Sequence, residues 1–328
     1  MFKTMKKIAI TMGDAAGIGP EIIAKALYCA EIRDFCAPLV IGSRIVMQEA
    51  IDLLKLPLKL KLIKTPDECA SVIGTIELIN VETPEGFEKS KATVKNGKAC
   101  VSYIKKAVEL ALNKKVDGIV TAPISKEALK MAGMKWHGHT EMLAELTNTK
   151  DYTMMLAGEP LKVILVTIHT PLRSVPDMVT RESVLKTIRL AKKACDMLDI
   201  KNPRIAVSGL NPHAGEAGIF GSEEGNAIIP AIEDAKKQGI PVTGPYPPDT
   251  IFHKAYKGKV DIVVCMYHDQ GLIPLKMVAF EEGVNVTVGL PLVSTSPDHG
   301  TAYDIAWEGI ANPSSILEAI KMASRLKI

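Results

Sequence analysis

The chain has little of what would commit it to a nucleic acid or to a membrane. Aromatic residues make up 5% of the 328 residues, the net charge is only +3, and no arginine-rich or lysine-rich arm is present, so nucleic-acid binding gains no support. No apolar run approaches the roughly 20 residues of a membrane span. The N-terminus lacks the apolar segment and cleavage site of a signal peptide. We therefore expect a cytoplasmic protein.

Cysteine is scarce and unpatterned. The six cysteines form no CxxC pair and show no disulfide-type spacing, so buried free thiols in a reducing compartment are expected. The sequence also lacks internal repeats, low-complexity tracts and a linker rich in proline and glycine. Because the length and the 47% hydrophobic content indicate about two domains, we expect crossing strands rather than a tether to join them.

The sequence does contain an alternation of short apolar runs with segments of helical period. Strands that alternate with helices build parallel sheets covered by helices, so the pattern predicts an α/β fold with mostly parallel sheets. The expected strands are residues 7–12, 38–42, 58–63, 116–120, 152–156, 162–168, 204–208, 261–266 and 284–288. The expected helices are a segment from the turn at 13–21 to about residue 30, and residues 101–112, 181–198, 228–237 and 315–326.

Three of the seven histidines carry the strongest functional signal. His169, His213 and His268 each stand where a predicted apolar strand runs out. In α/β proteins, ligands bind beyond the carboxyl ends of the strands. Three imidazoles from separate strands suit a divalent metal, with Zn²⁺ favoured over Mg²⁺, Mn²⁺ or Co²⁺. The alternative for each is a hydrogen-bonded loop histidine without a ligand, but together they predict a metal-assisted enzyme.

Two acids, a lysine and an amide stand near these histidines in the sequence. Asp269 follows His268 directly and Asp249 follows a proline-rich turn, so each is a candidate general base or metal neighbour. The alternative for Asp249 is a helix N-cap. Lys276 and Asn285 flank the next strand and suit a phosphate or carboxylate, although Lys276 alone would be an ordinary solvated lysine. The catalytic candidates are Asp249, Asp269 and Lys276.

Three further segments are considered for binding an anion or a nucleotide. His139 and Thr140 precede an apolar run, and a helix start there would turn backbone N–H groups toward an anion such as a carboxylate; capping without a ligand is the alternative. The turn at 13–19 follows a strand and opens a helix. It is not a GxGxxG fingerprint, and no suitable acid ends the next strand, which argues against a Rossmann site. The loop at 211–224 is the other nucleotide candidate.

Several blocks of the sequence together resemble one family. Asn-Pro-His-Ala-Gly-Glu at 211–216 and Tyr-His-Asp-Gln-Gly at 267–271 are highly specific in combination. With the blocks at 13–21, 138–141, 248–250 and 298–302 they resemble the 4-hydroxythreonine-4-phosphate dehydrogenase family. That family includes paralogous dehydrogenases of 4-phospho-D-threonate and 4-phospho-D-erythronate. The resemblance runs from about residue 6 to the C-terminus.

The resemblance implies a two-domain α/β fold like that of isocitrate and isopropylmalate dehydrogenases. One domain would comprise about residues 1–130 and 285–328, the other residues 131–284, with the active site in the cleft. It also implies a homodimer whose partner subunit completes the site. The implied activity is a metal-dependent, NAD- or NADP-linked oxidation and decarboxylation of a 4-phosphorylated four-carbon hydroxy acid, in pyridoxine biosynthesis.

The resemblance also assigns roles to individual residues. The implied metal ligands are His169, His213 and His268. The implied substrate contacts are His139, Thr140, Lys276, Asn285 and position 294. The cofactor would lie along the loop at 211–224, with Asn211, Gly215, Glu216 and Gly221 as contacts. Asp249 and Asp269 would line the site.

Two positions depart from the family pattern. Ala15 stands where proline is usual, a mild change in a turn. Ser294 stands where the family has a substrate-binding arginine, and a serine cannot replace the bidentate charge of a guanidinium. The stretch at 302–307 looks more like the D-threonate and D-erythronate group. A dehydrogenase of those substrates, a cis-diol dehydrogenase and a non-catalytic binding protein of the same fold therefore remain alternatives.

Overall fold

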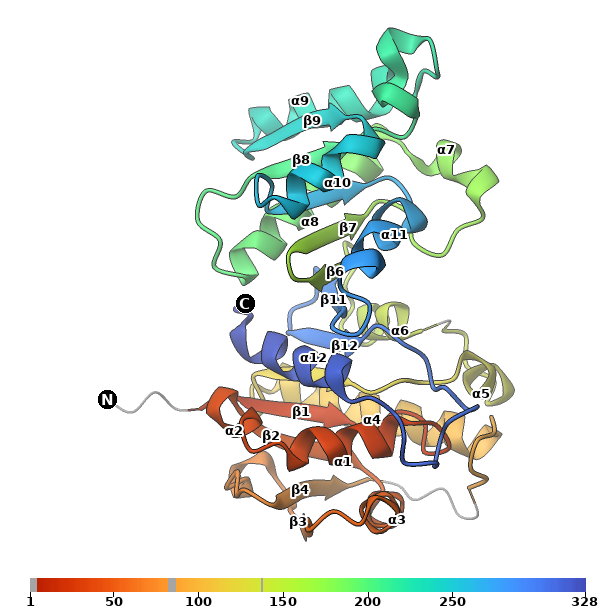
Figure 1. Ribbon diagram of the computed structural model, residues 1–328, viewed down its shortest axis with the longest axis vertical. Helices are drawn as coiled ribbons and strands as arrows, with labels where there is room; N and C mark the ends of the chain where they lie inside the picture. The colour runs from red at the N-terminus through yellow and green to blue at the C-terminus, as the bar shows by residue number, and fades with distance from the viewer. Residues whose placement is uncertain (1–4, 82–86, 137) are drawn as a thin grey trace. The chain divides into compact units, whose positions relative to one another are not determined.

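The protein divides into two compact units. The computed structural model describes residues 5–81, 87–136 and 138–328 (Figure 1). The first unit comprises Met1–Thr149, Leu290–Leu326 and Ile328, and the second comprises Lys150–Gly289 and Lys327. The boundaries therefore fall at 149/150 and 289/290, where the sequence placed them near 130 and 285. The first one moves because the helix formed by residues 139–146 packs on the first unit.

The first unit contains a parallel sheet. Its strands are β1 (Lys7–Thr11), β2 (Ala37–Gly42), β3 (Lys59–Leu62), β4 (Thr75–Asn80), β5 (Gly118–Thr121) and β12 (Ser294–Pro297). They lie in the order β3-β4-β2-β1-β5-β12, and every neighbouring pair runs parallel. Strand β2 is buried along its whole length, as expected for a parallel strand covered on both faces.

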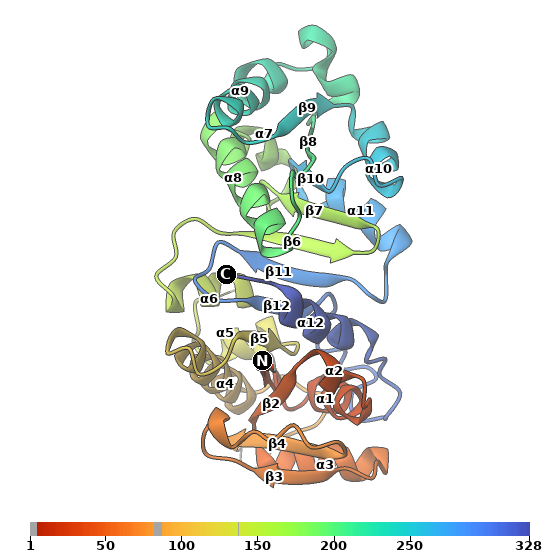
Figure 2. The same cartoon turned by 90° about the vertical axis from the view of Figure 1, so that its left-hand side faces the viewer.

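Helices cover both faces of this sheet. They are α1 (Gly19–Tyr28), α2 (Ile32–Phe35), α3 (Arg44–Leu54), α4 (Val94–Leu112), α5 (Lys126–Met131), α6 (His139–Leu146) and α12 (Ser314–Arg325), with a 3₁₀ turn at Pro66–Glu68. Figure 2 shows α4 and α5 on one face and α1, α2 and α12 on the other. Ser43, Thr93 and Ser125 cap the N-termini of α3, α4 and α5 through their hydroxyl oxygens, which explains where these helices start.

The second unit contains a mixed sheet. Its strands are β6 (Thr153–Gly158), β7 (Leu161–Leu165), β8 (Ile205–Ser208), β9 (Val242–Tyr246), β10 (Ile262–Cys265) and β11 (Val284–Val288). The order is β11-β6-β7-β10-β8-β9. Strand β6 runs antiparallel to β7 and β11, whereas the pairs β7/β10, β10/β8 and β8/β9 are parallel. Only two residues join β6 to β7, too few for a parallel crossover.

Helices flank this sheet as well. They are α7 (Val175–Met178), α8 (Arg181–Met197), α9 (Ile229–Lys237), α10 (Pro248–Tyr256) and α11 (His268–Val278), with helical turns at Leu172–Ser174, Pro212–Gly218 and Glu224–Ile228. Figure 2 shows α8 and α9 on one face and α10 and α11 on the other. A long amphipathic helix was predicted at 181–198, and α8 confirms it within one residue.

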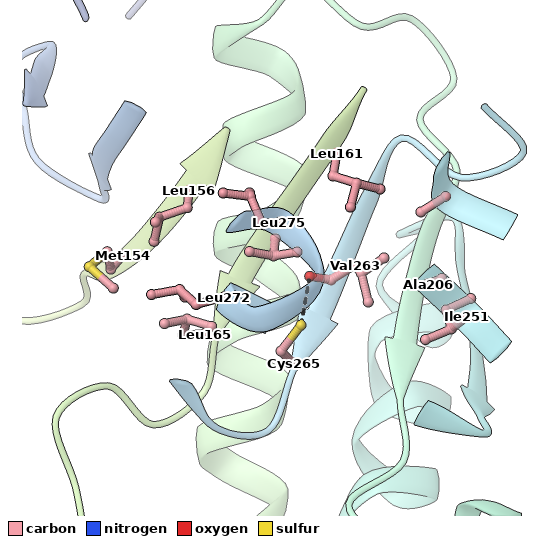
Figure 3. Close-up of a cluster of buried hydrophobic side chains, with 12 residues drawn as sticks. Met154, Leu156, Leu161, Leu165, Ala206, Ile251, Val263, Cys265, Leu272 and Leu275 are labelled. Atoms are coloured by element: carbon pink, nitrogen blue, oxygen red, sulfur yellow. Dashed lines mark hydrogen bonds between the residues drawn. The ribbon is translucent and has the colours of Figure 1, made fainter. Parts of the chain in front are cut away.

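The core under α10 and α11 follows the alternation of the strands (Figure 3). Alternate residues of β6, β7 and β10 point to this face, and Leu272 and Leu275 of α11 pack on them. The cluster consists of Met154, Leu156, Leu161, Val163, Leu165, Ala206, Ile251, Ala255, Val263, Cys265, Leu272 and Leu275. Burying each large aliphatic side chain contributes about 1.5–3 kcal/mol, so this layer anchors the start of α11, where His268 lies.

The expected elements have counterparts, most of them within a few residues, but α4 begins at Val94 and not at residue 101, and several other elements were not predicted. Strand β12 has the sequence Ser-Thr-Ser-Pro, which lacks an apolar run. Helix α11 carries Pro274 in its interior, a residue that normally ends a helix. All six cysteines are free thiols, as predicted, but only four of them are buried, and Cys29 and Cys69 are partly exposed. No helix in the described ranges is long and apolar enough to cross a membrane.

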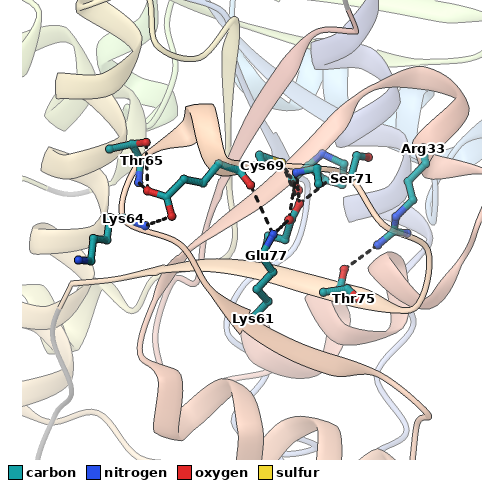
Figure 4. A network of polar contacts seen from close by, with 11 residues as sticks. Arg33, Lys61, Lys64, Thr65, Cys69, Ser71, Thr75 and Glu77 are labelled. Carbon is teal, nitrogen blue, oxygen red and sulfur yellow. Dashed lines mark hydrogen bonds and ion pairs between the residues drawn. The ribbon is translucent and has the colours of Figure 1, made fainter.

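A buried carboxylate fixes the loop between β3 and β4 (Figure 4). The side chain of Glu77 is 1% exposed. It accepts hydrogen bonds from the backbone N–H groups of Ala70 and Ser71, from Cys69 Sγ and from Lys61 Nζ, at 2.8–3.1 Å. Burial raises the pKa of the Glu77 carboxyl, but these hydrogen bonds, led by that from Lys61, outweigh burial and hold the pKa at about 2. The loop is therefore built around an ionised carboxylate.

Candidate functional site

Two of the three candidate histidines come together in the second unit. Strands β7 and β10 are parallel neighbours, so their carboxyl ends deliver both side chains to one edge of the sheet. The ring centroids of His169 and His268 are 5.6 Å apart. The sequence placed both in loops directly after strands. In the structure, β7 ends at Leu165, four residues before His169, and His268 is the first residue of α11.

Neighbouring side chains orient His268. Its Nδ1 lies 2.7 Å from Asp269 Oδ1. When Nδ1 of the neutral ring donates its N–H to this carboxylate, the lone pair on Nε2 is left to bind a metal. Buried Gln270 accepts a hydrogen bond from the Met266 N–H and donates one to the Gly209 carbonyl, each at 2.7 Å. Gln270 thereby ties the start of α11 to the end of β8, and so to the loop that carries the third histidine.

His213 lies on a left-handed turn after β8. Residues 213–217 all have positive φ, a conformation that costs roughly 1–2 kcal/mol for each residue other than glycine. Glu224 is buried and holds the start of this turn. Its Oε1 accepts the backbone N–H groups of Leu210 and Asn211, both at 2.8 Å, and its Oε2 accepts the Asn211 amide at 2.9 Å. The protein therefore stabilises a strained backbone at the position of His213.

Three imidazoles are suitable ligands for a metal, but the three candidate histidines do not all lie together in this structure. His169 and His268 adjoin, whereas the ring next to His213 is that of Phe220, 5.9 Å away between centroids. Within the described part of the chain, no three His, Cys, Asp or Glu side chains are close enough together to hold a metal ion. His169 and His268 can supply two imidazole ligands as they stand, and His213 would need its loop to shift to join them.

The two candidate acids differ in their surroundings. Asp269 is 68% exposed and contacts His268. Asp249 is exposed and is the second residue of α10. The alternative interpretation of Asp249 as the N-cap is wrong, because Pro247 occupies that position and Pro248 starts the helix. Asp249 still lies in the first turn of α10, where a negative charge interacts favourably with the helix dipole.

Lys276 and Asn285 belong to neighbouring parts of the second unit. Lys276 lies in the last turn of α11, with Nζ 5.6 Å from the ring centroid of Phe280. Asn285 is in β11, where its Nδ2 lies 3.0 Å from Met154 Sδ. Its Oδ1 is buried and has no hydrogen-bond partner among the described residues. A buried amide oxygen without a partner is uncommon, so this atom marks a position for a ligand or water.

The proposed cofactor contacts shape their own loop. A Cβ on Gly215 would lie 2.7 Å from Glu224 Oε2, and one on Gly221 would lie 2.4 Å from Asn211 Nδ2. A Cβ at either glycine would therefore force Glu224 or Asn211 to move. Asn211 donates to Glu224, as described above, and so has a structural task as well. Glu216 is exposed on the left-handed turn and is the member of this set that faces solvent.

The remaining candidates belong to the first unit. His139 and Thr140 are the first two residues of α6, at the helix start that was considered. The His139 ring forms a hydrogen bond with the Ala122 carbonyl. Burial lowers the pKa of His139 to about 4, against the opposing effect of that bond. Ser294 is buried as the first residue of β12, in register with Ile119 of β5.

The turn at 13–21 has a protein partner, the segment that follows β12. Glu21 accepts hydrogen bonds from the backbone N–H groups of Trp307 and Gly309. The Trp307 indole N–H donates to the Ala15 carbonyl at 3.1 Å. This turn lacks a dinucleotide fingerprint. It instead binds the segment that follows β12 through these hydrogen bonds.

Several buried polar residues that organise these sites were not predicted. They are Asp14, Glu21, Glu224 and Gln270. Each lies in or beside a block that was singled out for its glycines or its histidine. The sequence did contain a signal for these residues, because each is a charged or amide residue inside an otherwise apolar, glycine-rich motif. Such a side chain requires a hydrogen-bond partner when it is buried.

Comparison with known proteins identifies the family. Residues 34–323 match the family described as pyridoxal phosphate biosynthetic protein PdxA. The chain belongs to this family. As a PdxA family member it is a dehydrogenase, and therefore an oxidoreductase, as the resemblance implied. A 4-hydroxythreonine-4-phosphate dehydrogenase of Desulforapulum autotrophicum is 49% identical over 97% of this chain and 94% of its own length.

A second PdxA relative carries a different substrate in its name. The D-threonate 4-phosphate dehydrogenase of Cupriavidus necator is 47% identical over 97% of this chain and 96% of its own length. A crystal structure of 4-hydroxythreonine-4-phosphate dehydrogenase from Klebsiella pneumoniae has a TM-score of 0.90 and 43% identity, and the match covers 97% of this chain and 98% of that one. The fold is therefore that of the PdxA family, while overall identity does not separate the two substrates.

Proposed function

We propose that this PdxA family member is a metal-dependent, NAD- or NADP-linked dehydrogenase that oxidises and then decarboxylates a 4-phosphorylated four-carbon hydroxy acid. The names of the relatives supply the substrate class. The observation that carries the proposal is the pairing of His169 with His268 at the ends of two neighbouring parallel strands, with Asp269 on the second ring. That arrangement suits a divalent metal beside a substrate.

The proposed metal site has defined tasks for each side chain. When bound, a divalent metal lowers the pKa of a coordinated alcohol and polarises a carbonyl, and NAD(P) accepts a hydride. His169 and His268 would hold the metal, with His213 joining them after its loop shifts. Asp269 keeps the His268 proton on Nδ1 and so leaves Nε2 to bind. A set of imidazoles favours Zn²⁺.

We assign the distal phosphate to Lys276 and Asn285. The Lys276 ammonium supplies charge, and a half-turn of the Asn285 amide would exchange its unpartnered oxygen for its N–H₂ group. Ser294 carries no charge and is buried in β12. Charge compensation at the phosphate would therefore rest on Lys276 rather than on a guanidinium. His139 and Thr140 of the first unit are the other proposed substrate contacts, and Asp249 and Asp269 the proposed acid–base groups.

The loop at 211–224 is proposed to bind the cofactor. Gly215 and Gly221 let this loop pack closely against the side chains of Glu224 and Asn211, because neither carries a Cβ. Glu216 is exposed on the turn and could accept hydrogen bonds from a ribose. Asn211 would act by fixing the loop through Glu224.

The D-threonate or D-erythronate 4-phosphates are the second candidate substrates. The stretch at 302–307 favours them, because it looks more like the D-threonate and D-erythronate group than like the rest of the family. A 47% identical relative bears the name D-threonate 4-phosphate dehydrogenase. The reaction would be the same, with a hydroxyl group in place of the amino group next to the carboxylate.

We also propose that the protein is a homodimer. Large apolar side chains are exposed on α11 and just after it: Ile273, Met277, Val278 and Phe280 are 60%, 81%, 42% and 73% exposed. Ile273 and Met277 are four residues apart and so share a helix face. An exposed apolar patch of this kind commonly marks an interface, and here it lies on the helix that begins with His268.

A substrate panel tests the activity. The candidates are 4-hydroxy-L-threonine 4-phosphate, D-threonate 4-phosphate, D-erythronate 4-phosphate and an unphosphorylated cis-diol, each with NAD⁺ and NADP⁺. We expect reduced nicotinamide and CO₂ to form with a phosphorylated acid only, activity to disappear with a chelator, and Zn²⁺ to restore it. Preference for the cis-diol, or full activity with chelator present, would contradict the proposal.

A histidine pair tests the metal ligands. His213→Ala should abolish turnover and lower the bound metal, while His253→Ala, an exposed histidine on α10, should change neither. Asp269→Asn should weaken metal affinity about 10- to 100-fold, as expected for a group that orients a ligand. If His213→Ala keeps both its metal content and its activity, the assignment of His213 is wrong.

A further inference from the structure

Three buried side-chain oxygens of the first unit have no hydrogen-bond partner in the part of the chain that the structure describes. They are Oγ1 of Thr11, Oγ1 of Thr121 and Oδ1 of Asn96. Each of these residues is at most 1% exposed. A buried polar atom without a partner costs free energy, and such atoms are uncommon in native proteins. One ligand would satisfy all three oxygens if they lie together.

The two threonines point to the same face of the sheet. Thr11 and Thr121 are the last residues of β1 and β5 and are paired in register. Val120 is in register with Thr295, whose hydroxyl donates to the Ala319 carbonyl of α12 at 2.8 Å. Because side chains alternate along a strand, Thr121 and Thr11 point away from α12, toward the face that α4 and α5 cover (Figure 2).

Asn96 lies on that face, at the same ends of the strands. It is in the first turn of α4 and belongs to the buried stripe of this helix, with Cys100 one turn later. Helix α4 packs on β1 and β5 and leads into β5, so its N-terminus lies at the carboxyl ends of these parallel strands. A Cβ on Gly97 would lie 2.2 Å from the Ala128 carbonyl oxygen, so the first turn of α4 also contacts α5, the helix that follows β5.

The spacing of the strands suits one shared ligand. Neighbouring strands lie about 4.8 Å apart, so hydroxyls at paired positions are too far apart to bond to each other but can bind one atom between them. The Asn96 amide is oriented by its other end, because Nδ2 donates to the Lys91 carbonyl at 3.5 Å. An amide oxygen only accepts, so the ligand must offer Oδ1 a positive charge or a donor.

A buried carboxylate near these oxygens has no basic partner among the described residues. Asp14 is 0% exposed, and its oxygens accept the Tyr303 hydroxyl at 2.7 Å and the Ala16 N–H at 2.9 Å. Its own N–H donates to the carbonyl of Pro123, just after β5, at 2.9 Å. Burial and the Asp14 carboxylate raise the pKa of Cys100, on the buried stripe of α4. Because an unpaired buried carboxylate is costly, a positive charge is expected here.

We propose that the three unpartnered oxygens bind one monovalent cation, with Asp14 as its countercharge. Calcium and magnesium prefer carboxylate oxygens as direct ligands, whereas the direct ligands here are neutral and both Asp14 oxygens already accept hydrogen bonds from the protein. Neutral oxygens can replace the hydration shell of a monovalent cation. The ion would join the ends of β1 and β5 to α4. These residues have no role in the proposed reaction, so the cation site is independent of the proposed function.

Thermal unfolding of the full-length protein in potassium nitrate and in choline nitrate tests the binding, because choline is too large for a site between neighbouring strands. We expect potassium to raise the unfolding temperature by about 2–4 °C relative to choline at equal concentration, with a saturable dependence on potassium. Equal unfolding temperatures in the two salts, or a shift that does not saturate, would overturn the proposal.

Thr121→Val separates a cation from an ordered water, because it removes the hydroxyl and keeps the shape of the side chain. The hydroxyl has no protein partner, so we expect the variant to unfold in choline at the same temperature as the parent or higher, and to lose the potassium shift. A variant that is destabilised equally in both salts would show that an ordered water occupies the site, and would overturn the proposal.

Thr295→Val is the matched control on the opposite face of the same sheet. Thr295 is equally buried, but its hydroxyl has a partner in α12. This variant should unfold at a lower temperature than the parent in both salts and should keep the potassium shift. Loss of the shift in Thr295→Val as well would show that the shift does not report on the proposed site.

The position and the countercharge have tests of their own. In crystals grown with thallium(I) nitrate, anomalous scattering should place an ion between Thr11, Thr121 and Asn96, and a water alone at that position would overturn the proposal. Asp14→Asn should raise the potassium concentration at half of the maximal shift about tenfold or more, because it removes the nearby charge. An unchanged half-maximal concentration would show that Asp14 is not the countercharge.

Discussion

At the scale of single residues, burial and hydrogen bonding act on carboxylates in opposite directions. Asp14 and Glu77 are both buried. Burial raises the pKa of Asp14, and two hydrogen bonds only partly oppose it. Glu77 receives more donors, including an ammonium, and its pKa falls to about 2. At Asp14 burial outweighs the two hydrogen bonds, whereas at Glu77 the larger set of donors, one of them charged, outweighs burial.

Glu77→Gln should therefore destabilise the first unit in a pH-dependent way. The folded pKa of about 2 lies below the ordinary glutamate value of 4.5, so ionisation stabilises the fold. That contribution is complete above about pH 5, declines as the pH falls through the interval between the two values, and is lost below the lower one. We expect a loss of about 2–3 kcal/mol at pH 7, measured by urea unfolding, from a shift of this size.

Glu109→Gln is the control for that measurement. Glu109 pairs with Lys106 at 2.9 Å on α4 and is 56% exposed, so its replacement should change the free energy of unfolding by less than about 1 kcal/mol. The difference between the two variants should shrink from pH 7 to pH 3. Equal losses for both, or a Glu77→Gln loss independent of pH, would show that the Glu77 carboxylate is not the stabilising group.

The sequence predicted the residues that carry chemistry more readily than the residues that hold them. His169, His213 and His268 were visible because they follow apolar runs. Gln270 and Glu224 were not, because their partners are backbone atoms from other segments. Contacts of that kind depend on how strands are ordered in the sheet, which periodicity does not reveal.

At the scale of elements, the left-handed turn at 213–217 invites a paired substitution. Gly215 has φ of +79°, and an added Cβ would lie 2.7 Å from Glu224 Oε2. Gly215→Ala should therefore cost about 2 kcal/mol or more and weaken NAD⁺ binding, since both backbone and contact oppose it. Ala217 has φ of +56°, so Ala217→Gly relieves strain and should leave stability within about 1 kcal/mol of the parent.

Urea unfolding and a titration with NAD⁺ would measure both variants side by side. The substitutions exchange one methyl group two residues apart, so they differ mainly in backbone conformation and in contact with Glu224. If Gly215→Ala binds NAD⁺ as well as the parent protein does, the loop is not the cofactor site. If Ala217→Gly destabilises the protein more than Gly215→Ala does, backbone strain in the turn does not explain the loss of stability.

Element prediction succeeded where one residue type dominated and failed where composition was mixed. β11 was expected at 284–288 and lies at Val284–Val288, because its apolar β-branched residues favour a strand. β12 is polar and yet mostly buried, because β5 pairs with it and α12 packs on it. Tertiary packing, which the local sequence does not show, makes it a strand.

At the scale of the whole molecule, both ends of the chain build one unit and the middle builds the other. The sequence predicted this discontinuous arrangement in outline through the family resemblance. The boundary expected near residue 130 lies at 149/150 in the structure. Helix α6 packs on α4, and with it His139 belongs to the unit that contains Asp14 and Tyr303.

The oligomeric state is the property of the whole molecule most open to a direct test. Met277 is 81% exposed on α11 beside other exposed apolar side chains, so an aspartate there would place a charge in the proposed interface at a cost of several kcal/mol. Sedimentation should give about twice 35.4 kDa for the parent and a monomer for Met277→Asp. Leu112→Asp, an exposed leucine at the end of α4, should remain dimeric. Because the partner subunit is expected to complete the site, Met277→Asp should lose activity together with the dimer, and a fully active monomer would refute the proposed interface and the shared site.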